Sequence, residues 1–88
     1  MTDHPTPKTV IRCITLIEQE FPRLAGSIQP DTQLARHDID SFDRMGILLN
    51  VEQDFDVSID DATAAKLQTP RDFADAVTAA LATRKALA

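Results

Sequence analysis

Apolar residues recur three or four positions apart in three segments of this chain, and this spacing constrains its fold more than any other feature. Each segment follows a helix-start signal, in which a hydroxyl or carboxylate can accept a backbone N–H of the first turn. These signals are Thr6-Pro7, Asp40 with Asp43, and Thr69-Pro70 with Asp72. The pattern predicts helices over residues 7–20, 41–54 and 70–84.

Between the second and third of these segments, Phe55, Val57 and Ile59 alternate with polar residues. Alternation alone is typical of a strand, but the chain offers no second strand for pairing. We therefore expect an extended connector that leads into a short helix over residues 60–66, with Asp60 as its cap.

A long loop over residues 22–39 separates the first two predicted helices and contains Gly26 and Pro30. Loops of this length in small domains are usually either functional or disordered. Four apolar residues are spread along the loop and predict that it is ordered against the core. They are Leu24, Ile28, Leu34 and Ile39.

The composition agrees with a helical fold, since the 88 residues include two glycines and no Trp or Tyr. A chain of this length has room for one core. We expect a single all-α domain spanning residues 1–88, ordered over about 7–84, built as a small four-helix bundle with a long first loop and a short third helix. Cys13 is the only cysteine, so no internal disulfide is expected. We expect Cys13 to be a small buried residue of the first helix.

The net charge of −5 is concentrated in one segment, because residues 38–61 hold eight acidic residues and one basic residue. The negative electrostatic potential of this segment disfavours binding to nucleic acid and anionic membranes and favours binding to basic partners. A solvated acidic face would give the same composition. Residues 1–8 do not resemble a signal peptide, and no apolar run reaches membrane-spanning length. We expect a cytoplasmic monomer.

Ser41 follows Asp40 at the predicted start of the second helix, and three interpretations of it are open. The first interpretation is a purely local role, as a polar residue of a first helical turn. A hydrolase nucleophile would need a base, for which the chain offers only His4 and His37, and it lacks the G-x-S-x-G elbow. The third interpretation is a serine that another enzyme modifies, because a helix N-terminus tolerates a phosphodiester.

The segment that begins Asp54-x-Asp56-x-Ser58-x-Asp60 imitates the first ligands of a calcium-binding EF-hand loop. That loop needs glycine at its sixth position and a bidentate glutamate at its twelfth, where this chain has Ile59 and Ala65. No metal site is expected.

An ordered series of motifs along almost the whole chain resembles the acyl carrier protein family. The motifs are Asp31-Thr32-x-Leu34, Ile39-Asp40-Ser41-Phe42-Asp43, Val51-Glu52-x-Asp54-Phe55-x-Val57-x-Ile59, and Thr69-x-x-Asp72-Phe73 with Val77. The resemblance implies that a phosphopantetheinyl transferase attaches 4′-phosphopantetheine from coenzyme A to Ser41, beside Asp40. The domain itself would not be an enzyme: an acyl- or aminoacyl-loading ligase would charge the arm, and synthases or transferases would use the thioester.

The resemblance also implies that acidic residues of the second helix and its surroundings bind basic partner surfaces. The candidate partner-binding residues are Asp43, Arg44, Glu52, Asp54, Asp60 and Asp61. For Asp40, Asp43 and Asp60, helix capping is an alternative role.

Three positions depart from the family pattern: Asp38 replaces the usual glycine, Phe42 the usual leucine, and Gly46 the usual acid. Arg44 adds a positive charge. These changes argue against ordinary fatty-acid-synthase partners and favour a specialised lipid, polyketide or other secondary-metabolite pathway. An aminoacyl or peptidyl carrier, and a carrier-like interaction domain that is never modified, are the alternatives.

Five residues of the second and third predicted helices suggest either a space that shelters an acyl chain or, as we expect, ordinary core. They are Phe42, Met45, Leu49, Ile59 and Ala64.

Overall fold

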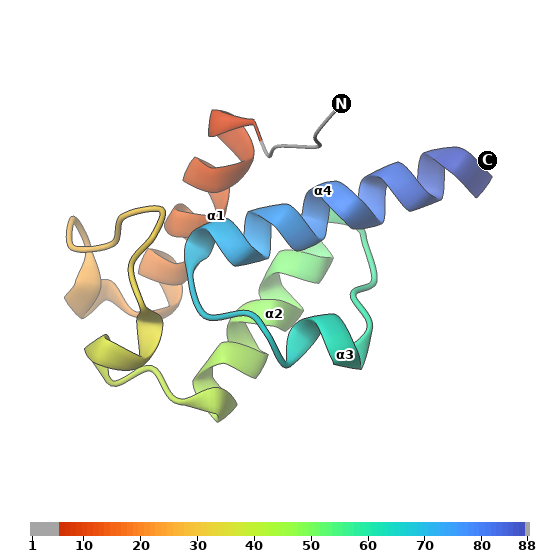
Figure 1. Cartoon of the computed structure of the whole chain (residues 1–88). Helices are drawn as coiled ribbons and strands as arrows, with labels where there is room; N and C mark the ends of the chain where they lie inside the picture. Colours follow the sequence, from red (N-terminus) through yellow and green to blue (C-terminus); the bar gives the residue numbers. More distant parts are fainter. Residues whose placement is uncertain (1–5, 88) are drawn as a thin grey trace.

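The computed structural model describes residues 6–87, a range that contains helices and turns but no strand (Figure 1). Three long helices pack against one another: α1 (Pro7–Glu20), α2 (Ser41–Phe55) and α4 (Pro70–Leu87). A short helix, α3 (Asp61–Ala64), lies between α2 and α4 in the chain. The predicted all-α architecture, with a long first loop and a short third helix, is confirmed.

The three long helices begin where their caps predicted. Thr6 Oγ1 accepts the N–H of Thr9 at 3.2 Å, and Pro7 occupies the first turn of α1. At the start of α4, Thr69 and Asp72 exchange hydrogen bonds between side chain and backbone in both directions, each 3.1 Å long. These contacts satisfy N–H groups that have no partner inside a helix.

The helix ends differ more from the predictions. α2 continues one residue beyond its predicted end, to Phe55, because Asp56 is the first residue in a left-handed conformation, with φ of 55°. α4 continues to Leu87 instead of residue 84, and α3 is shorter than the predicted 60–66. Asp60 nevertheless caps α3 as predicted, accepting the N–H of Thr63 at 2.7 Å.

The long loop between α1 and α2 is ordered and contains two short 3-10 helices, η1 (Pro22–Leu24) and η2 (Leu34–His37). Its four apolar residues are all buried, as predicted. Two backbone hydrogen bonds hold the loop to the start of α4: Leu34 N–H donates to Gln68 at 3.0 Å, and Arg71 N–H to Pro30 at 2.9 Å. The loop therefore brings the chain to the start of α2 along a fixed path.

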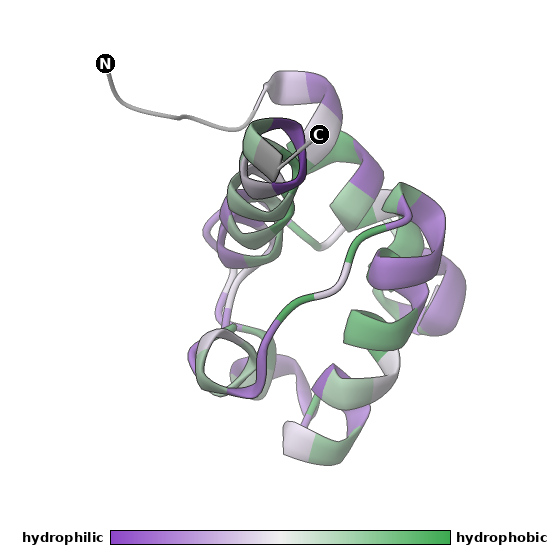
Figure 2. Cartoon of the chain, turned by 90° about the vertical axis from the view of Figure 1, so that its right-hand side faces the viewer, coloured by the Kyte–Doolittle hydropathy of each residue, from purple (hydrophilic) through white to green (hydrophobic). Residues whose placement is uncertain are grey.

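The core lies between the three long helices, each of which carries both hydrophobic and hydrophilic residues (Figure 2). α1 contributes Cys13 and Ile17, both fully buried, so the predicted position of Cys13 is confirmed. Burial of the Cys13 thiol, with a smaller effect from the Asp54 charge, raises its pKa to about 12. The innermost residues of the other two helices are Ile47, Val51, Phe73 and Val77.

The prediction that Phe42, Met45 and Leu49 belong to the core is wrong. Their exposed fractions are 85%, 58% and 55%. The physical reason is the helical period, because residues 42, 45 and 49 share one face of α2 while Ile47 and Val51 occupy the opposite one. α2 carries apolar residues on both faces, and the core takes only the face that contains Ile47, Leu48 and Val51.

Two ion pairs tie distant segments together. Arg12 of α1 binds Asp54 of α2 through two hydrogen bonds of 2.9 and 2.5 Å. Arg71 of α4 binds Asp31 of the first loop at 2.8 and 3.2 Å. In both pairs the hydrogen bond from arginine is the main reason that the carboxyl pKa lies below its usual value of 3.8.

These two pairs predict a loss of stability in acid. A carboxyl whose pKa is lower in the folded protein stabilises the fold above its unfolded pKa, and loses this effect as the pH falls through its folded pKa. We expect the Tm to fall as the pH is lowered from about 5 to about 3. The fall should be shallower in the double variant Arg12→Gln, Arg71→Gln. Arg23→Gln is the control, because Arg23 binds the backbone oxygen of His37 and not a carboxylate. Equal slopes in all three proteins would contradict this account.

Candidate functional site

Ser41 is the first residue of α2, and its side chain is exposed. It follows the capping residue Asp40, so its hydroxyl lies at the helix end where backbone N–H groups are unpaired and the helix dipole is positive. Within residues 6–87 no hydrogen bond occupies this hydroxyl. The oxygen that the sequence singled out is therefore open to a molecule that approaches from solvent.

The acidic residues beside Ser41 build the helix start. Asp40 Oδ1 accepts the N–H of Asp43 at 2.8 Å, and Asp43 Oδ2 accepts the N–H of Asp40 at 3.3 Å. This reciprocal pair is the capping box that the sequence predicted. The cap fixes the backbone on both sides of Ser41, so the serine is presented by a rigid element.

Asp38 explains one departure from the family pattern. It follows the last residue of η2 and adopts a left-handed conformation, with φ of 62° and ψ of 27°, and its N–H donates to the backbone oxygen of Leu34, the first residue of η2. Glycine enters this region without a steric penalty, and aspartate is among the few other residues that tolerate it. Asp38 therefore provides the turn that a glycine would provide, and it adds a charge two residues before Asp40.

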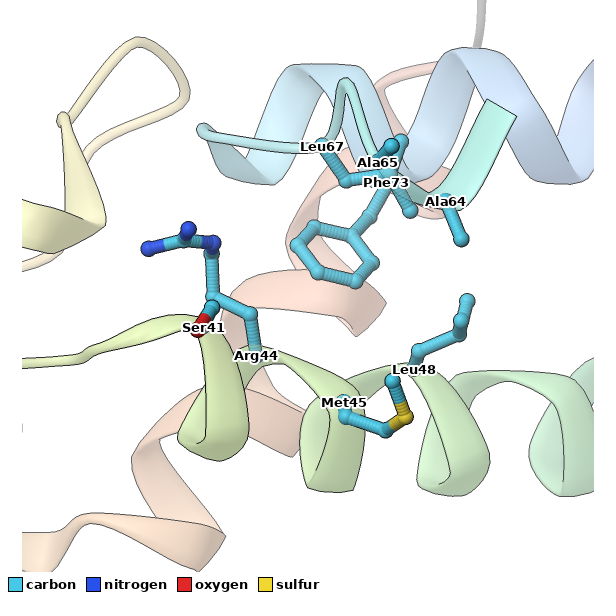
Figure 3. Close-up of a pocket in the computed structure, with 8 residues that line it drawn as sticks. All are labelled: Ser41, Arg44, Met45, Leu48, Ala64, Ala65, Leu67 and Phe73. Carbon is cyan, nitrogen blue, oxygen red and sulfur yellow. The ribbon is translucent and has the colours of Figure 1, made fainter. Parts of the chain in front are cut away.

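Arg44 lies one helical turn after Ser41 on α2. One of its guanidinium nitrogens donates to the backbone oxygen of Ile39 at 3.0 Å. Arg44 and Ser41 both line a cavity of about 130 Å³ between α2, α3 and the start of α4 (Figure 3). The remaining lining is apolar and consists of Met45, Leu48, Ala64, Ala65, Leu67 and Phe73.

This cavity only partly matches the space considered from the sequence. Met45 and Ala64 line it, whereas Phe42, Leu49 and Ile59 do not. Ile59 is half-buried and packs against the core, as expected of a core residue.

Of the predicted partner-binding residues, several already have partners within the fold. Asp43 and Asp60 cap helices, and Asp54 binds Arg12. Glu52 accepts the N–H of Ile59 at 2.8 Å and so fastens the connector after α2. Asp61 is exposed at the start of α3. These acids are spread over α2 and α3 and do not form one cluster around Ser41.

Sequence reasoning missed an exposed apolar surface next to Ser41. We call it the α2 apolar surface; it consists of Phe42, Met45 and Leu49. These residues are spaced by three and four, so they form one stripe that starts directly after Ser41. The sequence does contain a signal for this stripe. On a helical wheel of α2, Phe42, Met45 and Leu49 fall on the side opposite Ile47, so the wheel would have separated the stripe from the core face.

The hydrolase interpretation gains no support from the geometry. His37 is the last residue of η2, and within residues 6–87 no hydrogen bond joins its imidazole to Ser41. His4 lies outside the described residues. In the same range, no three His, Cys, Asp or Glu side chains are grouped to hold a metal ion.

The site fits a phosphodiester on Ser41. The hydroxyl is exposed, the helix N-terminus favours negative charge, and Arg44 lines the same cavity as Ser41. Phosphopantetheine is joined to proteins through such a bond, so Ser41 can hold this group, and Arg44 is the nearest cation along α2. When bound, the group supplies a thiol that carries cargo as a thioester.

In a comparison with protein families, the model for the phosphopantetheine attachment site matches residues 14–77. The chain therefore belongs to this family and is a carrier protein of the acyl carrier protein type, whose cofactor is covalently attached 4′-phosphopantetheine. Comparisons with curated proteins and with solved structures found no match. Among residues 6–87, no helix is long and apolar enough to cross a membrane.

Proposed function

We propose that Ser41 is the attachment site and that the protein carries acyl or related intermediates as thioesters to partner enzymes. The observation that carries this proposal is the exposed Ser41 hydroxyl on the first residue of α2, in a chain of the phosphopantetheine attachment family. Ser27 and Ser58 are also exposed, but neither begins a helix.

In the modification, Ser41 Oγ bonds to the phosphorus of the phosphopantetheine phosphate in coenzyme A. The bond from this phosphorus to the oxygen of the adenosine phosphate breaks, and 3′,5′-ADP leaves with the electron pair. The hydroxyl proton passes to a base of the phosphopantetheinyl transferase. The chain contributes a fixed nucleophile, while the catalytic groups belong to the transferase.

After modification, the chain itself performs no catalysis under this proposal. The small helical core holds the root of the arm, and the arm provides reach and a high effective concentration at partner active sites. A loading ligase charges the thiol, and synthases or transferases take the cargo. The reducing cytoplasm is the proposed setting because the thiol must remain free, and the proposed working form is a monomer.

We also propose that the α2 apolar surface is where the transferase docks. Three exposed apolar side chains start directly after Ser41, so an enzyme that reaches the hydroxyl must come close to them. Apolar anchors carry more binding energy than exposed ion pairs. Asp43, Arg44, Glu52, Asp54, Asp60 and Asp61 then form the polar surroundings of the docking area, as proposed partner-binding residues.

Leu49 tests this docking surface because it lies two turns away from Ser41 and cannot touch the reacting atoms. Leu49→Glu should lower the kcat/KM of the transferase about tenfold, which corresponds to a hot-spot contribution of about 1.4 kcal/mol. Ile11→Glu is the matched control, since Ile11 is 60% exposed on α1 and Leu49 55% exposed on α2. Equal rates for the two variants would refute docking on this surface.

The departures from the family pattern support a specialised pathway. A side chain at Gly46 would have its Cβ 3.4 Å from Glu20 Oε1, so the acid that is usual at this position would meet another carboxylate. Phe42 adds a large exposed apolar side chain to the surface beside Ser41. We propose lipid, polyketide or other secondary-metabolite biosynthesis, with an aminoacyl or peptidyl cargo as the second candidate.

Intact-mass measurement tests the proposal. After incubation with coenzyme A and a broad-specificity phosphopantetheinyl transferase, the protein should gain the mass of one phosphopantetheine. An unchanged mass with every transferase tried would favour the rival function, an unmodified carrier-like domain that only binds proteins.

The buried Cys13 makes the new thiol easy to count. Because its pKa is raised to about 12 and it is fully buried, Cys13 should not react with a thiol reagent at pH 8 in the folded protein. We expect no reactive thiol in the folded unmodified protein, one after denaturation, and one in the folded modified protein. Rapid labelling of Cys13 in the folded unmodified protein would contradict its burial.

A further inference from the structure

The Arg44 side chain turns back along α2 toward the loop that precedes the helix. Side chains of a helix tilt toward its N-terminus, and the hydrogen bond from Arg44 to the Ile39 oxygen, 3.0 Å long, fixes this direction. Ile39 lies two residues before Ser41, and Arg44 three residues after it. The carbon stem of Arg44 therefore lies beside Ser41 and the guanidinium reaches past it, as the close-up shows (Figure 3).

The guanidinium retains hydrogen-bonding capacity at this position. Arginine has five N–H donors, and the Ile39 oxygen takes one of them. Asp40 and Asp43 are close in the sequence, but their carboxylates accept backbone N–H groups. Within residues 6–87, the salt bridges of this protein join Arg12, Arg71 and Arg84 to acids, and none involves Arg44.

Two electrostatic effects act on Arg44. The positive end of the helix dipole opposes a cation in the first turns of a helix. The acids attract it, because Arg44 is the only basic residue of residues 38–61, where eight acids lie. An anion added beside Ser41 would strengthen this attraction.

We propose that Arg44 is the counter-ion of the phosphodiester on modified Ser41, binding its non-bridging oxygens through the unused N–H donors. The inference rests on the proposed attachment at Ser41. Modification adds one negative charge near Asp38, Asp40 and Asp43, and Arg44 neutralises it. The root of the arm is thereby held on the side of α2 where Ser41 and Arg44 share a cavity. Arg44 is a positioning residue in this role.

The experiment compares unmodified and fully modified forms of the wild type, Arg44→Gln, Arg44→Lys and Lys8→Gln. Lys8→Gln is the control, because it removes the same charge in the first turn of α1, at the opposite end of the molecule from the start of α2 (Figure 1). Modification should lower the Tm of Arg44→Gln by about 3 °C more than that of the wild type. The excess should vanish in about 1 M NaCl. Arg44→Lys should lie between the two, and Lys8→Gln should match the wild type.

NMR gives a second readout that does not depend on a change in stability. In the wild type, modification should shift the Arg44 Nε–Hε signal, and the ³¹P signal should differ between the wild type and Arg44→Gln. An unshifted Nε–Hε signal, or equal Tm changes in the wild type and Arg44→Gln, would overturn the role of Arg44 while attachment at Ser41 stands. A wild type that takes up no phosphopantetheine would remove both proposals.

Discussion

Ser41→Ala is expected to fold normally and to take up no phosphopantetheine, a complete loss of the modification. Alanine removes the only atom that forms the bond to phosphorus. Ser41 is exposed, and the capping box of α2 is made by Asp40 and Asp43, so the helix start does not depend on the hydroxyl. Intact mass after incubation with transferase and coenzyme A measures the uptake, and far-UV circular dichroism checks the fold.

The controls for this variant are Ser27→Ala and Ser58→Ala, which remove the other two serines, both exposed. Each should still gain one phosphopantetheine. Uptake by Ser41→Ala, or loss of uptake in either control, would assign the modification to another hydroxyl.

Phe73→Ala is expected to destabilise the protein by about 3–5 kcal/mol, because it empties a large volume in a closely packed interior. Phe73 has no exposed surface, and it closes the inner wall of the cavity beside Ser41 (Figure 3). Domains typically have a free energy of unfolding of roughly 5–15 kcal/mol. The variant is therefore expected to lose a large part of its stability.

Urea unfolding followed by circular dichroism measures this effect, since the chain has no tryptophan to follow. Ile11→Ala is the control: it removes an apolar side chain that is 60% exposed on α1, and it should change the free energy of unfolding by less than about 0.5 kcal/mol. A loss below about 1 kcal/mol for Phe73→Ala would mean that this residue is not part of the core.

The parts of the fold that the sequence predicted correctly depend on short-range signals. The caps Thr6, Asp40 and Thr69 act on N–H groups within three residues, so the residues themselves suffice to place three helix starts. The helix ends were less accurate, because a residue such as Asp56 ends α2 through its backbone conformation, which its identity permits but does not require.

The parts that were mistaken or missed depend on tertiary packing. α2 has two apolar faces, and only the positions of α1 and α4 decide that Ile47 enters the core while Phe42 stays in solvent. Likewise, Asp54 looked like a free acid of the second helix until the fold placed Arg12 beside it. The hydrogen bond from Arg44 to Ile39 also depends on how the loop folds, and no residue pattern predicts it.

Peptide mapping of the modified protein is the most direct measurement of the attachment site. Trypsin cleaves after Arg36 and Arg44, and the peptide between them, residues 37–44, contains Ser41 as its only hydroxyl side chain. The account predicts that this peptide, and no other, carries the mass of phosphopantetheine. The group on any other peptide, or an unmodified peptide 37–44 from a protein that has gained the mass, would contradict it.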